Sequence, residues 1–169
     1  EKGENIGGLN KEPSGSKKTG SRQRWKPDLE VFTDIDIPVA YYQDVLKRQA
    51  VVNKGLTFVF RNQTEQGFET EEFCYEDGIA DYVKELVGEE ALTSIQYVEA
   101  ERRGRDRADK PDYRVKLSAA FVFSNRVKLT EYYHNSSWLE HGGAPERAVK
   151  QAFVSQIDAY LKQGGKYLK

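Results

Sequence analysis

The sequence predicts an α+β fold with a mostly antiparallel sheet and helices on one face. Three segments carry apolar residues at helical spacing, near 38–52, 77–88 and 145–163. Between them stand segments that alternate in polarity or are rich in β-branched and aromatic residues, as strands are. Of the 169 residues 38% are hydrophobic, which is enough for the core of one domain.

The N-terminal stretch has the composition of a tail. Residues 1–24 hold five glycines and almost no apolar side chains, so burial cannot offset the entropy of ordering. Lysines and arginines outnumber acids there by six to three. We expect a solvated tail or linker rather than a nucleic-acid arm. The ordered part is predicted to begin with "WKPDLEVF" (25–32), which contains a Pro-Asp turn.

The first helix is predicted from Pro38, which suits a first helical turn, with Asp36 as a candidate cap. Gly55 is a plausible stop. The apolar stripe of this helix consists of Val39, Tyr42, Val45, Leu46 and Val52.

A hairpin should follow. "GLTFVFRN" (55–62) and "EEFCYE" (71–76) are typical of strands, and "QTEQG" between them is typical of a turn. Cys74 lies in the second strand. No sequence feature supplies a base partner, so we expect a small buried hydrophobe rather than a nucleophile.

The second half repeats helix and strand patterns. "DGIADYVKELVG" (77–88) predicts a short helix capped by Asp77 and ended by Gly88. Strands are expected at 94–102 and 113–124, the latter with an alternating apolar face. An "NR" turn should then lead into an antiparallel return strand at 127–135.

The last element is a long helix over about 145–163, ended by Gly164 and Gly165. Its predicted buried stripe consists of Val149, Ala152, Phe153, Ile157, Tyr160 and Leu161. The alternating side chains before it are expected to be core residues rather than base-stacking platforms; these are Tyr113, Phe121, Phe123, Tyr132 and Tyr133.

The two histidines of the chain invite a metal or acid–base interpretation. His134 and His141 flank Glu140, but the H-x6-H spacing does not fix both rings on one face. Phosphate-loop, dinucleotide-binding, zinc-protease and hydrolase-elbow motifs are all missing, as are paired cysteines. We therefore predict a structural junction between strand and helix, built from Asn135, Gly142, Gly143 and Pro145.

One loop is a candidate for nucleic-acid contact. Segment 102–112 contains the candidate DNA-contact residues Arg102, Arg103, Arg105, Arg107 and Lys110. Acids interleave with them (Glu101, Asp106, Asp109 and Asp112), so a solvated loop is the stronger prediction. The net charge of −1 gives no global basic field.

Composition also bears on location. No apolar run approaches the roughly 20 residues that span a bilayer, and the N-terminus lacks a signal-peptide core. The single cysteine cannot form an internal disulfide, which favours a reducing compartment. The chain begins with Glu1 and contains no methionine, so we expect a fragment of a longer protein.

Four stretches together resemble the second, transducer domain of the B subunit of bacterial type IIA topoisomerases. "TGSRQRWKPDLEVF" is similar to T-G-T-x-x-x-F-x-P-D-x-x-x-F, and "VLKRQAVVNKGLTFVFRNQ" to the family's L-x-x-R…N-x-G segment. "FCYEDGIADYVKEL" resembles F-x-Y-x-G-G-I-x-x-[FY]-V-x-x-L. "NSSWLEHGGAPERAVKQAF" stands where the family has N-N-I-x-T-x-E-G-G-T-H. In that last stretch His141 replaces the family's acid and Ala144-Pro145 replaces Thr-His, so the chain would lie on a divergent branch.

The resemblance implies residues 1–18 as a tail and 19–169 as a transducer domain that ends before its Q-T-K loop. It also implies a left-handed βαβ crossover, as in a ribosomal-protein-like domain. In the family the transducer relays ATP binding to DNA strand passage. The lysine of Q-T-K reaches the nucleotide, and Q-T-K does not occur here. We therefore expect no cofactor in this chain, ATP and Mg²⁺ in the parent enzyme, and no activity of the fragment alone.

The implied partners are double-stranded DNA, the DNA-cleaving A subunit and a second B subunit, with no membrane, in the bacterial cytoplasm near the nucleoid. Gyrase and topoisomerase IV are not distinguished by these motifs. Two alternatives stay open. One is a stand-alone nucleic-acid or protein interaction module of the same fold. The other is a middle domain of a related mismatch-repair or chaperone-type ATPase.

Overall fold

The computed structural model describes residues 4–166 and divides the chain into two units, residues 1–37 and 38–169. The predicted tail and domain extend beyond the described residues at 1–3 and 167–169. In the first unit the described part contains no helix or strand. It does contain the predicted Pro-Asp turn, in which the Asp28 carbonyl accepts hydrogen bonds from the N–H groups of Val31 and Phe32.

The second unit begins with helix α1 (Val39–Val52), which follows Pro38 as predicted. Asp36 does not cap it, because the residue before the helix is Pro38 and no side chain caps the first turn. The C-terminal turn of α1 provides the best-buried residues of the described chain, Ala50 and Val51, at 0% and 1% exposure.

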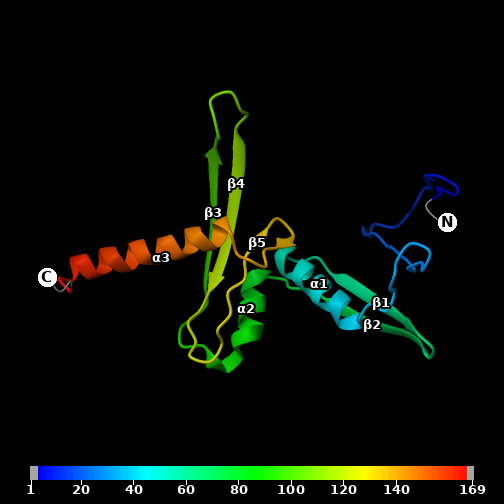
Figure 1. Cartoon of the computed structure of the whole chain (residues 1–169), viewed down its shortest axis with the longest axis horizontal. Coiled ribbons are helices and arrows are strands. Elements are labelled where there is room, and N and C mark those ends of the chain that lie inside the picture. The colour runs from blue at the N-terminus through cyan, green and yellow to red at the C-terminus, as the bar shows by residue number, and fades with distance from the viewer. Residues whose placement is uncertain (1–3, 167–169) are drawn as a thin grey trace. The chain divides into compact units, whose positions relative to one another are not determined.

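Strands β1 (Phe58–Thr64) and β2 (Gly67–Phe73) form an antiparallel hairpin next to α1 (Figure 1). Burial alternates along β1, and the ring of Phe60 stacks on Tyr42 of α1 with centroids 5.8 Å apart. Cys74 follows β2 and is exposed, so the prediction of a buried cysteine is wrong. Its neighbour Tyr75 turns inward to the core instead.

Helix α2 (Ile79–Val87) continues into a single 3₁₀ turn, η1 (Gly88–Glu90). Gly88 ends α2 as predicted, but Asp77 does not cap it. The residue before the helix is Gly78, and the N–H of Asp77 donates to Asp81. Tyr82 of α2 meets Tyr75 edge to face, which ties α2 to the core at Ala50 and Val51.

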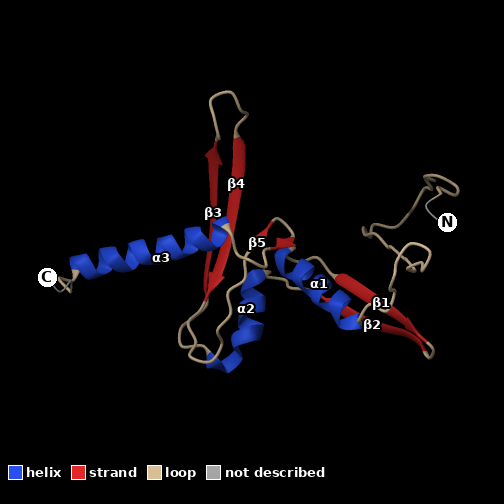
Figure 2. Ribbon diagram, viewed as in Figure 1, coloured by secondary structure: helices blue, strands red, loops and turns tan. Residues whose placement is uncertain are grey.

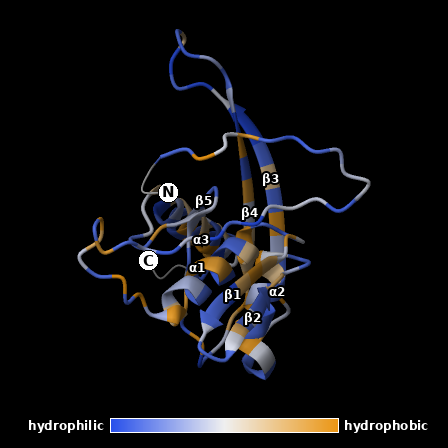
Figure 3. Ribbon diagram, turned by 90° about the vertical axis from the view of Figure 1, so that its right-hand side faces the viewer, coloured by the Kyte–Doolittle hydropathy of each residue, from blue (hydrophilic) through white to orange (hydrophobic). Residues whose placement is uncertain are grey.

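Strands β3 (Gln96–Gly104) and β4 (Tyr113–Phe121) run antiparallel over nine residue pairs, from Gln96↔Phe121 to Gly104↔Tyr113. The apolar face predicted on β4 exists but is not core. Val115 and Leu117 are about half exposed, as is Phe123 beyond the strand. Figure 3 shows hydrophobic colour along this hairpin and hydrophilic colour in its end loop.

The predicted return strand over 127–135 is wrong. Only β5 (Tyr133–His134) forms there, and it pairs with β6 (Ser137–Trp138) rather than with β4. The backbone explains this difference. The Phe123 carbonyl accepts from Leu92, and the Ser124 hydroxyl accepts from the N–H groups of Arg126 and Val127. These bonds turn the chain away from the edge of β4.

Helix α3 (Ala144–Gln163) has Pro145 in its first turn and ends at Gly164, as predicted. Its Phe153 meets Phe121 of β4 edge to face, with centroids 5.6 Å apart. The remainder of its predicted stripe is not buried, since Ile157 and Tyr160 are more than half exposed. Nothing in residues 4–166 covers that part of the helix.

The α+β class and the antiparallel pairing are confirmed, but the strands form three separate two-stranded sheets (Figure 2). The left-handed crossover stays a prediction, because no described sheet has a third strand through which to define it.

Candidate nucleic-acid interface

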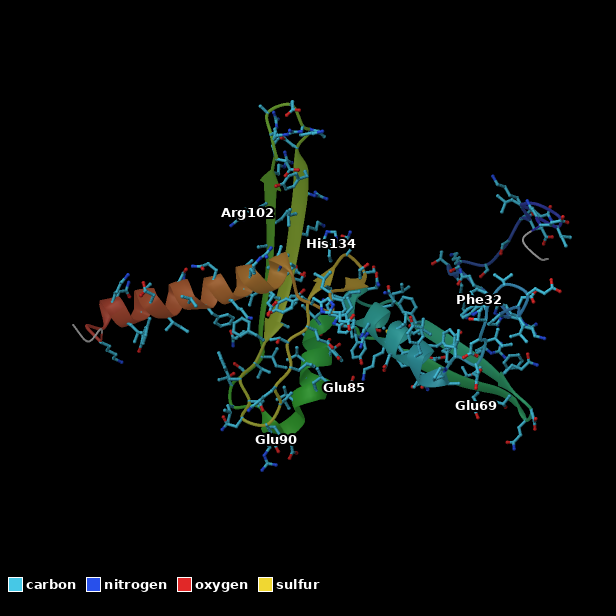
Figure 4. All side chains as sticks on the ribbon, viewed as in Figure 1. Phe32, Glu69, Glu85, Glu90, Arg102 and His134 are labelled. Carbon is cyan, nitrogen blue, oxygen red and sulfur yellow. The ribbon has the colours of Figure 1, made fainter. Side chains whose placement is uncertain are left out.

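The structure gathers the five predicted basic residues at one end of the β3–β4 hairpin. Arg102, labelled in Figure 4, and Arg103 lie at the end of β3, just before its last residue Gly104, while Arg105, Arg107 and Lys110 lie in the loop. Two of the loop cations are paired with acids. Arg105 Nε lies 2.6 Å from Asp112 Oδ1, and Arg107 Nε lies 3.6 Å from Asp109 Oδ1. The loop arginines are therefore partly neutralised, as the interleaved acids suggested.

The strand arginines point to opposite faces of the hairpin, because successive residues of a strand alternate. Arg102 stands opposite Val115 and shares the apolar face. Arg103 stands directly opposite Arg114 on the polar face, where like charges repel each other. Among the described residues Arg103 has no ion pair, whereas Arg114 lies 3.5 Å from Glu101.

Lys116 follows Arg114 on the same face and stands opposite Glu101. Arg103, Arg114 and Lys116 thus share one face of the hairpin with Glu99 and Glu101, three cations against two acids, and we call this surface the polar face of β3–β4. Sequence reasoning missed Arg114 and Lys116 because only the strand register places them beside Arg103. An anion held between Arg103 and Arg114 would relieve their repulsion.

The predicted junction residues lie between β5 and the first turn of α3. Asn135 has a φ of 53° in the turn between β5 and β6. Gly142 is buried with a φ of 67°, and a Cβ there would lie 2.8 Å from Glu146 Cβ. Gly143 precedes the first residue of α3, and Pro145 lies in its first turn. The bonds Gly142 N–H to Leu139 O and Gly143 N–H to His141 O complete the turn.

The two histidines are both exposed side chains of this junction (His134 is labelled in Figure 4). Within residues 4–166 no three of His, Cys, Asp and Glu converge on a position that could hold a metal ion. Each helix of this part is too short or too polar to span a bilayer.

A tyrosine–carboxylate cluster links α1, α2 and the junction, and no sequence signal marked it. Glu85 of α2 accepts from Lys47 Nζ at 2.6 Å and from Tyr75 Oη at 2.7 Å. These bonds lower the pKa of Glu85, with Lys47 as the larger cause. Burial raises the pKa of Tyr75 well above its usual range, and the bond to Glu85 adds to the effect.

Glu131 plays the same part on the other side of the cluster. It accepts a hydrogen bond from Tyr133 Oη at 2.9 Å, and its negative charge lies near Tyr82. Burial, followed by the charge of Glu131, raises the pKa of Tyr82 to about 12. Burial also raises the pKa of Tyr133 strongly. The tyrosine hydroxyls therefore stay protonated donors near neutral pH.

A surface cavity of about 460 Å³ lies between α1, β2 and α2, beside this cluster. Most of the charged side chains that line it are acidic, and two of these acids already accept hydrogen bonds. Glu71 accepts from Gln43 at 2.6 Å, and Glu85 is held by Lys47. Cys74 lies on the rim, with its Sγ 3.6 Å from a Glu76 oxygen.

The chain is similar to B subunits of bacterial DNA gyrase and topoisomerase 4. A model of the DNA gyrase B family matches residues 78–169. The DNA gyrase B subunit of Mycoplasmoides gallisepticum is 26% identical over 148 residues, covering 86% of this chain and 23% of that protein. The Chlamydia muridarum gyrase B subunit is 28% identical, covering 86% and 18%. The DNA topoisomerase 4 B subunit of Streptococcus pneumoniae is 24% identical, covering 88% and 21%. The chain thus spans about a fifth of the length of these curated relatives.

Proposed function

The chain belongs to the DNA gyrase B family, and from that premise we propose that it relays ATP binding or hydrolysis to DNA strand passage in a type II topoisomerase. The observation that carries the proposal is the match of 78–169, which spans α2, both later sheets and α3. Relatives named as gyrase and topoisomerase 4 B subunits cover most of the chain and support the same parentage.

We propose the polar face of β3–β4 as the surface that meets DNA. Arg103, Arg114 and Lys116 present cations along one side of a strand pair, where they can follow a phosphate backbone. No base-reading element accompanies them, so contact should be independent of sequence and sensitive to salt. Arg114 is paired with Glu101, just as Arg105 and Arg107 of the loop are paired with Asp112 and Asp109, so Arg103 is the strongest candidate for a phosphate contact.

The test is a titration of fluorescent duplex DNA with the purified chain between about 50 and 200 mM salt. Binding should be weak, and Arg103→Gln should reduce the slope of log affinity against log salt by about 0.9, the value for one lost phosphate contact. Arg61→Gln is the matched control, because Arg61 is an exposed strand arginine on the acidic hairpin. Salt-insensitive binding, or equal effects of the two variants, would contradict the proposal.

Nucleotide chemistry is proposed to belong to other parts of the parent enzyme. The sequence contains no phosphate loop and no Q-T-K segment. Purified chain should therefore hydrolyse no ATP above background in a coupled assay. Turnover that persists in preparations from two different purification routes would refute this.

The remaining partners follow from the same premise. We propose that the parent protein works in the cytoplasm, pairs with a DNA-cleaving A subunit and forms a dimer of B subunits. Co-purification of the full-length protein with an A subunit would test the assembly, and a full-length protein that stays monomeric with ATP would contradict it.

A further inference from the structure

The segment between β4 and α3 is bound to α1 by two neighbouring side chains. Gln49 Nε2 donates to the Ser136 carbonyl at 2.7 Å, and the Arg48 guanidinium lies 3.9 Å from the centre of the Trp138 ring. Both residues directly precede Ala50 and Val51, the best-buried part of the chain. The attachment point on α1 is therefore rigid.

The same segment approaches α2 at Glu131. Its carboxylate accepts a hydrogen bond from Tyr133 of the segment and lies near Tyr82 of α2, whose pKa is raised by burial and then by this charge. Lys47 of α1 also lies over the Tyr82 ring, 5.7 Å from its centre. Residues 131–138, which we call the strap, are thus bound to α1 and lie beside Tyr82 of α2.

A hydrogen-bonded turn joins the strap to α3. The Leu139 N–H donates to the Tyr132 carbonyl at 2.8 Å, and Gly142 donates to Leu139 at 3.0 Å, just before α3 begins at Ala144. Further along α3, Phe153 contacts Phe121, but Val154, Ile157 and Tyr160 are 55–64% exposed. The strap is therefore the main fixed connection at the start of α3.

We propose that the strap couples α1 and α2 to α3, with Arg48, Gln49 and Tyr82 as positioning residues that set where α3 begins. A displacement of α1 or α2 then moves the first turn of α3. The functional meaning of this coupling, as one step of the relay, rests on the proposed function. The coupling itself requires neither ATP nor DNA.

Hydrogen exchange of the purified chain tests the coupling. In Gln49→Ala the amides of 132–148 should exchange about fivefold faster, as expected for the loss of one hydrogen bond, while β1 and β2 keep their rates. Gln43→Ala is the matched control, since Gln43 lies on the same helix but bonds to Glu71. Ser136→Ala should change nothing, because Gln49 binds the main-chain carbonyl.

Trp138→Leu supplies an independent variant that leaves α1 intact. It removes the ring under Arg48 and should speed exchange over the same residues. Unchanged rates over 132–148 in both Gln49→Ala and Trp138→Leu would overturn the proposal, as would acceleration spread evenly over the chain. A negative result in the exchange experiment does not bear on the proposed DNA contact, and a negative DNA titration does not bear on the coupling. The two proposals are therefore tested separately.

Discussion

The two long hairpins of the second unit share a secondary structure and differ in almost everything else. Hairpin β1–β2 (58–73) has one Lys or Arg against four acids, a formal charge of −3, whereas β3–β4 (96–121) has seven against five, a charge of +2. Helix α1 covers one face of β1–β2, with Tyr42 on Phe60. The apolar face of β3–β4 is covered only near Phe121 in the part of the chain that the structure describes.

The difference shows that alternation in a sequence specifies a face but not what covers it. Helix α1 directly precedes β1 in the chain, so a short connection packs it there. The cover available to β3–β4 from residues 4–166 reaches only one end of the hairpin. One hairpin is therefore part of the core, and the other carries exposed apolar and basic faces together.

The largest expected difference in stability is between two Val→Ala substitutions, one in the covered part of the second unit and one on the exposed face of β4. Val51→Ala should lower the free energy of unfolding by about 2–3 kcal/mol, because Val51 is 1% exposed and a cavity remains. Val115→Ala on the apolar face of β4 should cost less than about 0.5 kcal/mol, since Val115 is 50% exposed. Urea denaturation measures both. Equal costs would show that the face of β4 is covered in solution.

A smaller difference in stability is expected between Gly→Ala substitutions at the ends of the two hairpins. Gly67 has a φ of 130°, so Gly67→Ala strains the β1–β2 turn at a cost of about 1 kcal/mol. A Cβ at Gly104 would lie 2.8 Å from the ring end of Tyr113, which is 45% exposed. That ring can swing aside, so Gly104→Ala should change stability by less than about 0.5 kcal/mol. Thermal unfolding of the two variants measures both costs. A larger loss of stability in Gly104→Ala than in Gly67→Ala would contradict the prediction.

The pH dependence of stability should come from the tyrosine–carboxylate cluster of α1 and α2. The pKa of Tyr82 is raised to about 12, so its stabilising effect is complete below pH 10 and is lost as the pH rises from 10 to 12. Glu85 acts in the opposite direction, because its lowered pKa gives stability that is lost as the pH falls below about 4.5. Tyr82→Phe should cost about 1 kcal/mol at neutral pH and flatten the alkaline limb. Denaturant midpoints of both proteins should be measured between neutral pH and about pH 11. The prediction is contradicted if the midpoint of Tyr82→Phe falls with pH as steeply as that of the unchanged protein.

The smallest effect should come from the ion pairs at the end of β3–β4. Both partners of Arg105–Asp112 are about half exposed, so Asp112→Asn should change the free energy of unfolding by less than about 0.5 kcal/mol. The same substitution frees Arg105, so DNA affinity should rise slightly in the salt titration. Unchanged affinity would mean that Arg105 does not face the DNA, and a fall in affinity would contradict the prediction.

Local patterns in the sequence predicted the elements well. Pro38 and Gly88 marked helix ends correctly, and the spacing of α2 and α3 fixed their lengths to within a few residues. These features depend on neighbours in the chain. The return strand at 127–135 was wrong because the hydroxyl of Ser124 holds a turn that no hydrophobic pattern reports.

The part of the candidate interface that depends on neighbours in the chain was predicted, and the part that depends on strand pairing was not. A run of charges located Arg102, Arg103, Arg105, Arg107 and Lys110 at one end of a hairpin. Arg114 and Lys116 joined them only through the register of β3 and β4, which hydrophobic alternation does not determine. The contacts of Arg48 and Gln49 with the strap also escaped prediction, because they join residues almost ninety positions apart.

The contact between Gln49 and Ser136 has a consequence for the order in which the chain folds. It closes a loop of 87 residues, whereas β3 and β4 are joined by the short stretch 105–112. Closing the longer loop costs about 2 kcal/mol more chain entropy, so the hairpins should form before the strap docks. Stopped-flow refolding followed by Trp138 fluorescence should therefore lag behind the recovery of backbone circular dichroism.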